Sequence, residues 1–203
     1  MTVATTPSRN VSIAPPIPMK KWTVEEYHQL IERGAFANDN RFELLEGWIV
    51  PKTSRNPPHD ASLALTQREI ARRIPQDWHI RPQSAITTGD SEPEPDLAVV
   101  AGTPRAYSQR HPGAADIALL VEIADSSLLD DRRRKIRIYA RAGIKIYWII
   151  NVVDLQVEVY SDPITEATTP AYRRREIIPA GESVSLDIGG ASLPPIPVRD
   201  LLP

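Results

Sequence analysis

The segment 117-IALLVEIA-124 constrains the fold more than any other part of the sequence, because all of its residues except Glu122 are apolar. Alternate side chains of a β-strand face opposite sides of a sheet, so this pattern predicts a strand that other layers cover on both faces. Ile117 and Leu119 are expected on the face opposite Glu122. A buried carboxylate loses several kcal/mol of hydration unless a cation or hydrogen-bond donors compensate it. Glu122 is therefore a candidate site residue; the alternative is a strand-end glutamate that reaches water or pairs with an arginine.

Three helices are predicted around this strand. Thr23 and Glu26 have the spacing of a capping box, and the helix that they begin stops at Gly34. Asp60 is expected to cap a helix that Pro75 ends. The third helix spans 128–142 and is closed by Gly143. Strands are predicted on both sides of the turn at Gly47 and over the ranges 78–86, 96–101, 146–151, 156–160, 172–178 and 183–188. This order predicts an α/β (α+β) domain with a mixed sheet covered by helices.

Composition excludes several classes of protein. The chain has 203 residues and no cysteine, which excludes a disulfide scaffold, a cysteine nucleophile and a thiolate metal site. The 24 basic and 26 acidic residues nearly balance, so a nucleic-acid partner would need a local basic patch. Apolar runs are too short to span a bilayer and no export signal is evident, so we expect a cytoplasmic protein without a membrane partner. Residues 1–19 are rich in Pro, Thr and Ser and predict a flexible arm.

Asp96 is the second candidate acid, placed at the start of the strand 96–101 directly after 92-EPEP-95. If strands 96–101 and 117–124 are antiparallel neighbours, Asp96 and Glu122 converge at one end of the sheet. Two close carboxylates repel each other, and a shared Mg²⁺ or Mn²⁺ would relieve that repulsion. The alternative is that Asp96 only caps a loop.

Lys135 adds a cation on the helix 128–142, where it shares a stripe with Ile138 and Tyr139. This stripe should pack on the sheet, which would bring the ammonium group beside the two carboxylates. There it can position a water or stabilise negative charge in a transition state. The alternative is a lysine that extends along the sheet edge to solvent.

Several segments together resemble the Uma-type restriction endonucleases, a bacterial group of the PD-(D/E)XK nuclease superfamily. The resemblance spans roughly residues 22–160 and is carried by the order and spacing of 42-FELLEGWIV-50, His59, 95-PDLAVV-100, 121-VEIADSS-127, Lys135 with Tyr139, and 142-AGIKIYWIIN-151. It implies a restriction-endonuclease-like core over about 59–151. This core lies within one nuclease-like domain at 20–203, which adds a helix and strands before the core and further strands after it.

The resemblance also implies roles for individual residues. Asp96 and Glu122 would hold Mg²⁺ or Mn²⁺. The superfamily's usual lysine lies two residues after the glutamate, where this chain has Ala124. Members of this group carry the lysine on the next helix, at the place of Lys135. Glu43 matches an upstream acid that can add a metal ligand.

His59 matches a histidine that contacts phosphate or transfers a proton. Two of these assignments keep open alternatives. Glu43 competes with the neighbouring Glu46 for the upstream role, and either residue can be an ordinary surface acid. His59 can be an ordinary residue at the start of a helix.

The basic stretch 132-RRRKIR-137 offers a local phosphate-binding face. Its candidate nucleic-acid contacts are Arg132, Arg133, Arg134 and Arg137. The alternative is a solvated helix surface balanced by Asp130 and Asp131.

The leading interpretation is a divalent-metal-dependent endonuclease that hydrolyses nucleic-acid phosphodiesters, with DNA as the expected partner and a homodimer as the expected assembly. A second hypothesis is a catalytically silent nucleic-acid-binding or assembly protein with the same fold. A sugar hydrolase with two carboxylates ranks lower, because aromatic residues are only 6% of the chain and such a site has no role for a buried lysine.

Overall fold

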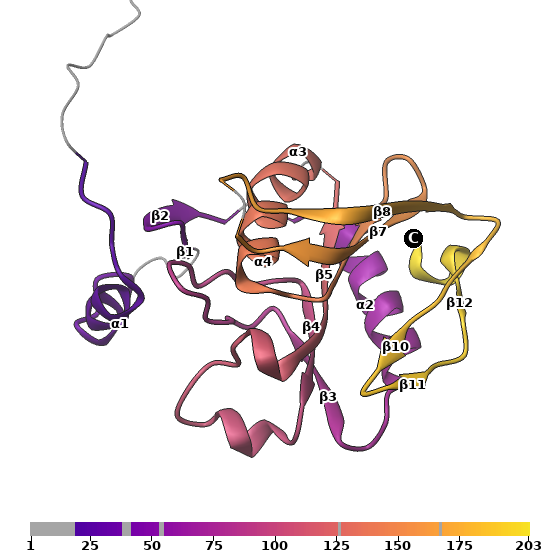
Figure 1. The fold of residues 1–203 in the computed structure, drawn as a ribbon, viewed down its shortest axis with the longest axis horizontal. Helices are drawn as coiled ribbons and strands as arrows, with labels where there is room; N and C mark the ends of the chain where they lie inside the picture. Colours follow the sequence, from indigo (N-terminus) through magenta and orange to yellow (C-terminus); the bar gives the residue numbers. More distant parts are fainter. Residues whose placement is uncertain (1–18, 38–41, 53–54, 126, 167) are drawn as a thin grey trace, which may run out of the picture.

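The computed structural model describes residues 19–37, 42–52, 55–125, 127–166 and 168–203, so the predicted N-terminal arm lies outside the described residues except for Met19. A six-stranded sheet in the order β3-β4-β5-β6-β7-β8 forms the centre of the molecule (Figure 1). Neighbouring strands are antiparallel except for β5 and β6, which are parallel. The strands are β3 (Trp78–Pro82), β4 (Leu97–Ala101), β5 (Ile117–Ala124), β6 (Ile146–Asn151), β7 (Gln156–Ile164) and β8 (Ala171–Pro179).

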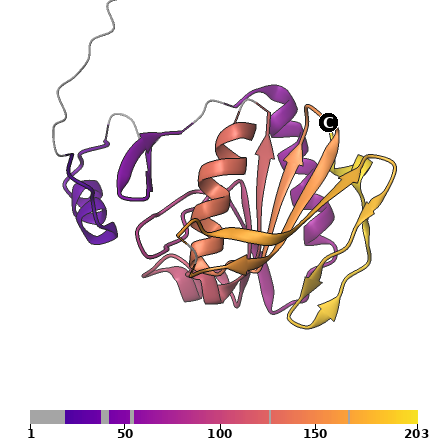
Figure 2. The same cartoon turned by 45° about the horizontal axis from the view of Figure 1, so that its top comes forward.

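Helices cover both faces of this sheet, as the apolar strand 117–124 predicts. Helix α2 (Pro57–Ala71) lies on one face, and the helical segment that ends in α4 (Ile136–Ala142) lies on the other (Figure 2). That segment begins with α3 (Leu128–Asp130) and passes through a π-helical turn over Asp131–Lys135. Two short 3₁₀ segments, Pro104–Tyr107 and Ala114–Asp116, lie between β4 and β5.

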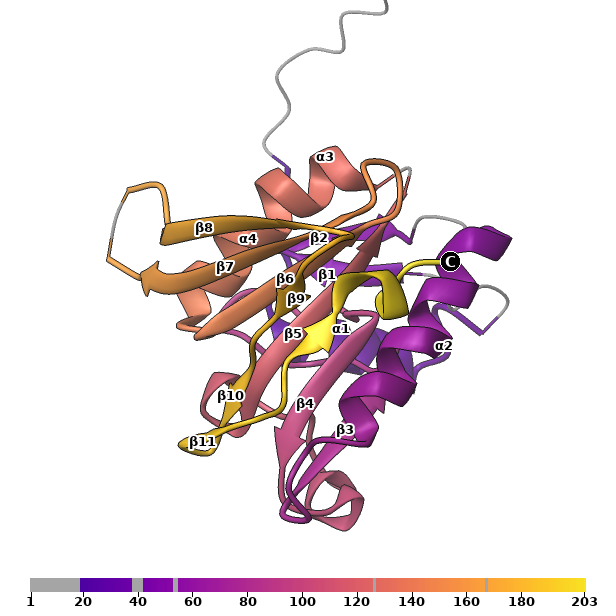
Figure 3. The same cartoon turned by 90° about the vertical axis from the view of Figure 1, so that its right-hand side faces the viewer.

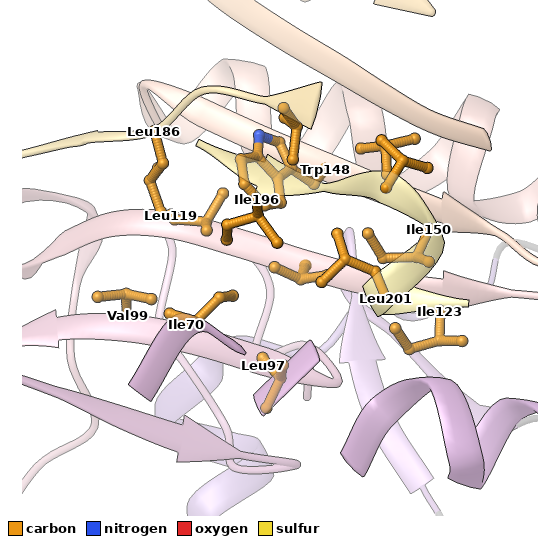
Figure 4. Packing of buried hydrophobic residues seen from close by; sticks show 14 of the residues in the cluster. Ile70, Leu97, Val99, Leu119, Ile123, Trp148, Ile150, Leu186, Ile196 and Leu201 are labelled. Carbon is orange, nitrogen blue, oxygen red and sulfur yellow. The ribbon is translucent and has the colours of Figure 1, made fainter. Parts of the chain in front are cut away.

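The C-terminal strands complete the face that α2 covers. They run beside α2 across the central strands (Figure 3), and Ile196 and Leu201 pack with Trp148 of β6 in one hydrophobic cluster (Figure 4). The C-terminal segment therefore packs on the body of the protein. The predicted strand 183–188 is two short strands instead. The elements are β9 (Ser183–Val184), β10 (Asp187–Ile188), β11 (Ala191–Ser192), β12 (Ile196–Pro197) and the 3₁₀ segment Val198–Leu201.

The N-terminal elements stand outside the central sheet. Helix α1 (Val24–Glu32) begins with the predicted capping box: the Thr23 hydroxyl accepts from the Glu26 amide, and the Glu26 carboxylate accepts from the Thr23 amide, each at 3.1 Å. The hairpin of β1 (Phe42–Leu45) and β2 (Trp48–Pro51) turns at Gly47, whose φ of 82° favours glycine. A single bridge from Leu44 to Glu92 joins this hairpin to the segment before β4.

Three local predictions are wrong. Helix α2 starts at Asn56, whose side chain accepts from the His59 amide at 3.1 Å, so Asp60 lies inside the first turn and is not the cap. The predicted strand 78–86 ends at Pro82, because the next residue, Gln83, has a left-handed φ of 46° and so leaves the extended conformation. In β5 a bulge pairs Val100 with Ile117, so Ile117 packs on the α4 face and not on the face of Leu119.

Candidate active site

Asp96 and Glu122 come together at one end of the two central strands. Leu97 of β4 pairs with Val121 of β5, so the residues that precede and follow them, Asp96 and Glu122, are neighbours across the ladder. Asp96 Oδ2 also accepts from the Ile123 amide at 2.8 Å, which ties the aspartate to β5. The antiparallel pairing that the convergence required is thus present.

Lys135 and Tyr139 reach Glu122 from the helical layer formed by the α3–α4 segment. Lys135 Nζ donates to Glu122 Oε1 at 2.8 Å, and the Tyr139 hydroxyl donates to the same oxygen at 2.7 Å. All three side chains are buried, and Glu122 keeps only 5% of its side-chain surface exposed. Lys135 closes the π-helical turn, a kind of helix irregularity that often occurs at functional sites.

Asp131 is the acid that the sequence analysis missed. It is buried four residues before Lys135 and accepts from the Ser127 hydroxyl at 2.6 Å. Side chains four residues apart share a helix face, so the spacing to Lys135 was the available signal. In the sequence, Asp131 entered only the alternative interpretation of the basic stretch, as a solvated counterion of the arginines.

The buried acids shift one another's protonation. Burial raises the pKa of Glu122 to about 8; Lys135 opposes this shift, and the nearby Asp131 and Asp96 add to it. Burial likewise raises the pKa of Asp131 to about 6. For Lys135, burial lowers the pKa, but the attraction of Glu122, Glu43 and Asp131 outweighs it and holds the pKa well above the ordinary range. The site therefore has one fixed positive charge among acids that compete to ionise.

His59 contacts the other carboxylate. Its Nε2 lies 3.1 Å from Asp96 Oδ2, and the first turn of α2 places it there. Burial disfavours the charged forms of both groups, but their mutual hydrogen bond and attraction outweigh it, so the pKa of His59 is raised and that of Asp96 is lowered. His59 is thus a partner of Asp96 and not only a residue at a helix start.

Glu43 and Glu46, the two candidates for the upstream acid, have different environments. Glu43 is buried at the same cavity, where its Oε2 accepts from the Glu94 amide at 3.1 Å. Glu46 is held by Arg137 and Arg141, whose hydrogen bonds lower its pKa to about 2. The geometry therefore favours Glu43 for the upstream role.

A cavity of about 120 Å³ connects these groups. It is polar and lies between the hairpin, the start of α2 and the α3–α4 segment. Its lining includes Glu43, His59, Asp96, Glu122, Asp131, Arg134 and Lys135. The five residues that the sequence analysis singled out for catalysis therefore line one cavity, together with Asp131.

The four arginines proposed to bind nucleic acid are not equivalent. Arg132 donates from Nε to the fully buried Glu158 at 3.0 Å, and Arg137 pairs with Glu46. Arg134 lines the cavity and lies 3.3 Å from Asp130. Arg133 is exposed, and it makes no ion pair with the residues that the structure describes. Arg133 and Arg134 are therefore better placed to meet a phosphate than Arg132 and Arg137.

The donor set fits a hard divalent cation. Mg²⁺ is commonly bound by one or two protein carboxylates while it retains several waters, and Asp96 and Glu122 supply such a pair. Within the described residues, Asp96 Oδ1 and Glu122 Oε2 accept no protein hydrogen bond, so each acid keeps an oxygen for a ligand. A cation here would also offset the burial that raises the pKa of Glu122.

These features define a restriction-endonuclease-like fold: a mixed sheet between helices, with an Asp, a Glu and a Lys gathered at the ends of central strands. The chain belongs to the Uma2 family, whose model is described as "Putative restriction endonuclease" and matches residues 24–195. Among solved structures, the chain is similar to a protein from Anabaena variabilis ATCC 29413, titled a "putative nuclease belonging to DUF820", with a TM-score of 0.59. The two are 17% identical, and the alignment covers 79% of this chain and 88% of that one. Curated proteins give no match to the sequence.

No helix in the described part of the chain is long and apolar enough to cross a membrane.

Proposed function

We propose that the protein is an endonuclease that uses Mg²⁺ or Mn²⁺ to hydrolyse phosphodiester bonds in DNA. The observation that carries this proposal is the buried contact between Lys135 Nζ and Glu122 Oε1 at 2.8 Å, on the strand next to Asp96. Two acids at one polar cavity can hold a divalent ion, and a lysine beside them can stabilise charge on a phosphate, which are two ways to accelerate phosphodiester hydrolysis. Membership of the Uma2 family supports the same class of reaction.

Asp96 and Glu122 would hold the metal ion, with Glu43 as a further ligand at the same cavity. When bound, the ion supplies Lewis-acid polarisation of a phosphate oxygen and lowers the pKa of a bound water. Glu122 can take this role only when ionised. Lys135 favours that ionised form, while Tyr139 holds the carboxylate in place by its hydrogen bond.

Lys135 has a second task in this proposal. Its pKa is raised, so it stays an ammonium group in neutral solution and can stabilise negative charge that develops on the phosphate. His59 orients Asp96 through the 3.1 Å contact and can hold or release a proton at Nε2. Arg133 and Arg134 would contact the DNA backbone outside the cavity. A homodimer would present two such sites to the two strands of DNA.

The proposal is tested by incubating the purified protein with supercoiled plasmid, single-stranded DNA and RNA in Mg²⁺, Mn²⁺ or EDTA. Glu122→Gln and Lys135→Met are the test variants. Glu176→Gln and Lys145→Met are matched controls, because both side chains are exposed and lie away from the cavity. We expect metal-dependent cleavage of DNA by the wild type and both controls, and a loss of at least about a hundredfold in both test variants.

Equal activity in the test and control variants would overturn the site. Binding of DNA without cleavage by any folded form, in any metal, would overturn the enzymatic proposal and favour the silent binding protein.

A further inference from the structure

A second cluster of ligating side chains lies away from the candidate active site. His28 of α1, Glu92 before β4 and His111 in the β4–β5 connection bring one ligand atom each within 4.8 Å of one another. Three segments that are distant in sequence therefore meet at these residues. In the part of the chain that the structure describes, no other three His, Asp or Glu side chains have ligand atoms this close together.

The contacts at the cluster leave one imidazole without a partner. His28 Nε2 lies 2.7 Å from Glu92 Oε2 and 2.8 Å from Oε1, whereas His111 Nε2 lies 3.9 Å from Glu92 Oε1, beyond a hydrogen bond. His111 Nδ1 is buried and has no hydrogen-bond partner among the described residues. A buried ring nitrogen without a partner is costly, and the side-chain contacts of the His111 ring with Glu92 and with the His28 ring both lie within the same cluster.

We propose that His28, Glu92 and His111 bind a divalent transition-metal ion of the zinc class. Tetrahedral bonds of about 2.0–2.1 Å put the ligand atoms about 3.3 Å apart. Glu92 Oε1 lies 2.8 Å from His28 Nε2 and 3.9 Å from His111 Nε2, which bracket that value, and all three ligand atoms lie within 4.8 Å of one another. Small side-chain rotations would thus bring all three atoms onto one ion. Two imidazoles and one carboxylate suit Zn²⁺ and its neighbours and disfavour Mg²⁺, which prefers oxygen ligands.

The surroundings of the cluster support a built site. The Glu92 side chain is only 2% exposed, and the Thr87 hydroxyl donates to its Oε2 at 2.9 Å, the kind of outer hydrogen bond that orients metal ligands. The two histidines also line a cavity of about 680 Å³ that is open to solvent. This cavity provides an entry path for the ion and room for a water as a fourth ligand.

Such an ion would link the N-terminal helix to the body of the protein. Glu92 lies four residues before Asp96, and its backbone amide donates to Leu44 of the hairpin at 2.7 Å. The ion would therefore fasten α1 to the segment that leads into the candidate active site. This site is separate from the proposed Mg²⁺ site and does not depend on the proposed nuclease activity.

The test is a titration of the full chain with Zn²⁺ by isothermal calorimetry, after treatment with EDTA and dialysis. Test variants are His28→Gln with His111→Gln, and Glu92→Gln. His79→Gln is the matched control, because His79 lies on β3 and contacts the Gly102 carbonyl oxygen. Glu122→Gln tests whether Zn²⁺ binds at the candidate active site instead. Circular dichroism checks that each variant is folded.

We expect one Zn²⁺ per wild-type chain, binding at least about a hundredfold weaker in the double histidine variant, and unchanged binding in the His79 and Glu122 variants. Co²⁺ in place of Zn²⁺ should give the visible absorption of a tetrahedral site, and the double histidine variant should lose it. Hydrogen exchange of residues 24–32 should slow when Zn²⁺ is added. The proposal is overturned if the wild type binds no Zn²⁺, if the double variant binds as tightly as the wild type, or if Glu122→Gln removes the binding.

Discussion

Lys135 Nζ lies 2.8 Å from Glu122 Oε1, and both side chains are buried between the sheet and the α3–α4 segment. The family resemblance implies a lysine on this helix and not on the strand that carries the glutamate. The contact with Glu122 shows that a lysine on the helix reaches the glutamate. Ala124, at the position two residues after the glutamate, packs instead in the hydrophobic cluster with Tyr139. The lysine ammonium group thus reaches Glu122 from the helical layer that covers this face of the sheet, and not from β5 itself.

Removing the cation should destabilise the fold as well as the site. In Lys135→Met the ionised form of the buried Glu122 loses its partner, so we expect a loss of about 3 kcal/mol in the free energy of unfolding at pH 9, above the Glu122 pKa of about 8. Adding Glu122→Gln removes the uncompensated charge and should recover most of that loss while activity stays absent. Urea denaturation and plasmid cleavage measure the two effects. If the double variant is no more stable than Lys135→Met, the charge pair does not govern stability here.

The raised pKa of Glu122 predicts a dependence of stability on pH. The unfolded chain ionises this residue near pH 4.5, while the folded protein keeps the proton until about pH 8. The folded state binds more protons over that window, so its stability relative to Glu122→Gln should fall as pH rises, by at most about 1.4 kcal/mol per pH unit. Urea denaturation in EDTA at several pH values measures this slope. Mg²⁺ should flatten it, and an identical pH profile in the two proteins would contradict the shift.

The contact between His59 and Asp96 also predicts a loss of stability as pH rises, over the pH range in which the imidazole titrates. The pKa of His59 is raised, so its contribution is complete below its unfolded pKa and is lost as pH rises through the folded value. The pKa of Asp96 is lowered, so its contribution is lost only in acid. The stability difference between wild type and His59→Asn should therefore be about 1 kcal/mol at pH 5.5 and smaller at pH 8. A larger difference at pH 8 would exclude a charged His59 as the partner of Asp96.

Arg132 and Arg133 should separate folding from nucleic-acid binding. Glu158 is fully buried and accepts from Arg132, Tyr160 and Arg175, so Arg132→Ala should cost about 1.5–3 kcal/mol of stability. Arg133→Ala should leave stability within about 0.5 kcal/mol and weaken DNA binding, with a smaller dependence of affinity on salt. Thermal denaturation and fluorescence anisotropy at several salt concentrations measure these effects. Unchanged DNA affinity in Arg133→Ala would remove this residue from the proposed interface.

Sequence patterns alone located most of the architecture and the three central residues of the candidate site. The apolar strand 117–124 required layers on both faces, and its lone Glu122 was a candidate site residue because a buried acid needs a partner. The stripe on the helix 128–142 placed Lys135 toward the sheet. These inferences succeed because side-chain periodicity follows directly from backbone geometry.

Only the tertiary structure decided which partner each charged residue takes. Arg132 and Arg133 are adjacent and chemically identical, yet one is held by a buried glutamate from β7 and the other is exposed. Asp131 lies at the cavity because a π-helical turn and the packing of α4 bury it. His28, Glu92 and His111 meet only because α1 and two loops converge. Electrostatic and metal-ligand contacts act over a few ångströms, between segments that are distant in the chain. Local sequence therefore determines the helices and strands and which of their faces are buried. The packing of these elements determines which charged and metal-binding side chains meet.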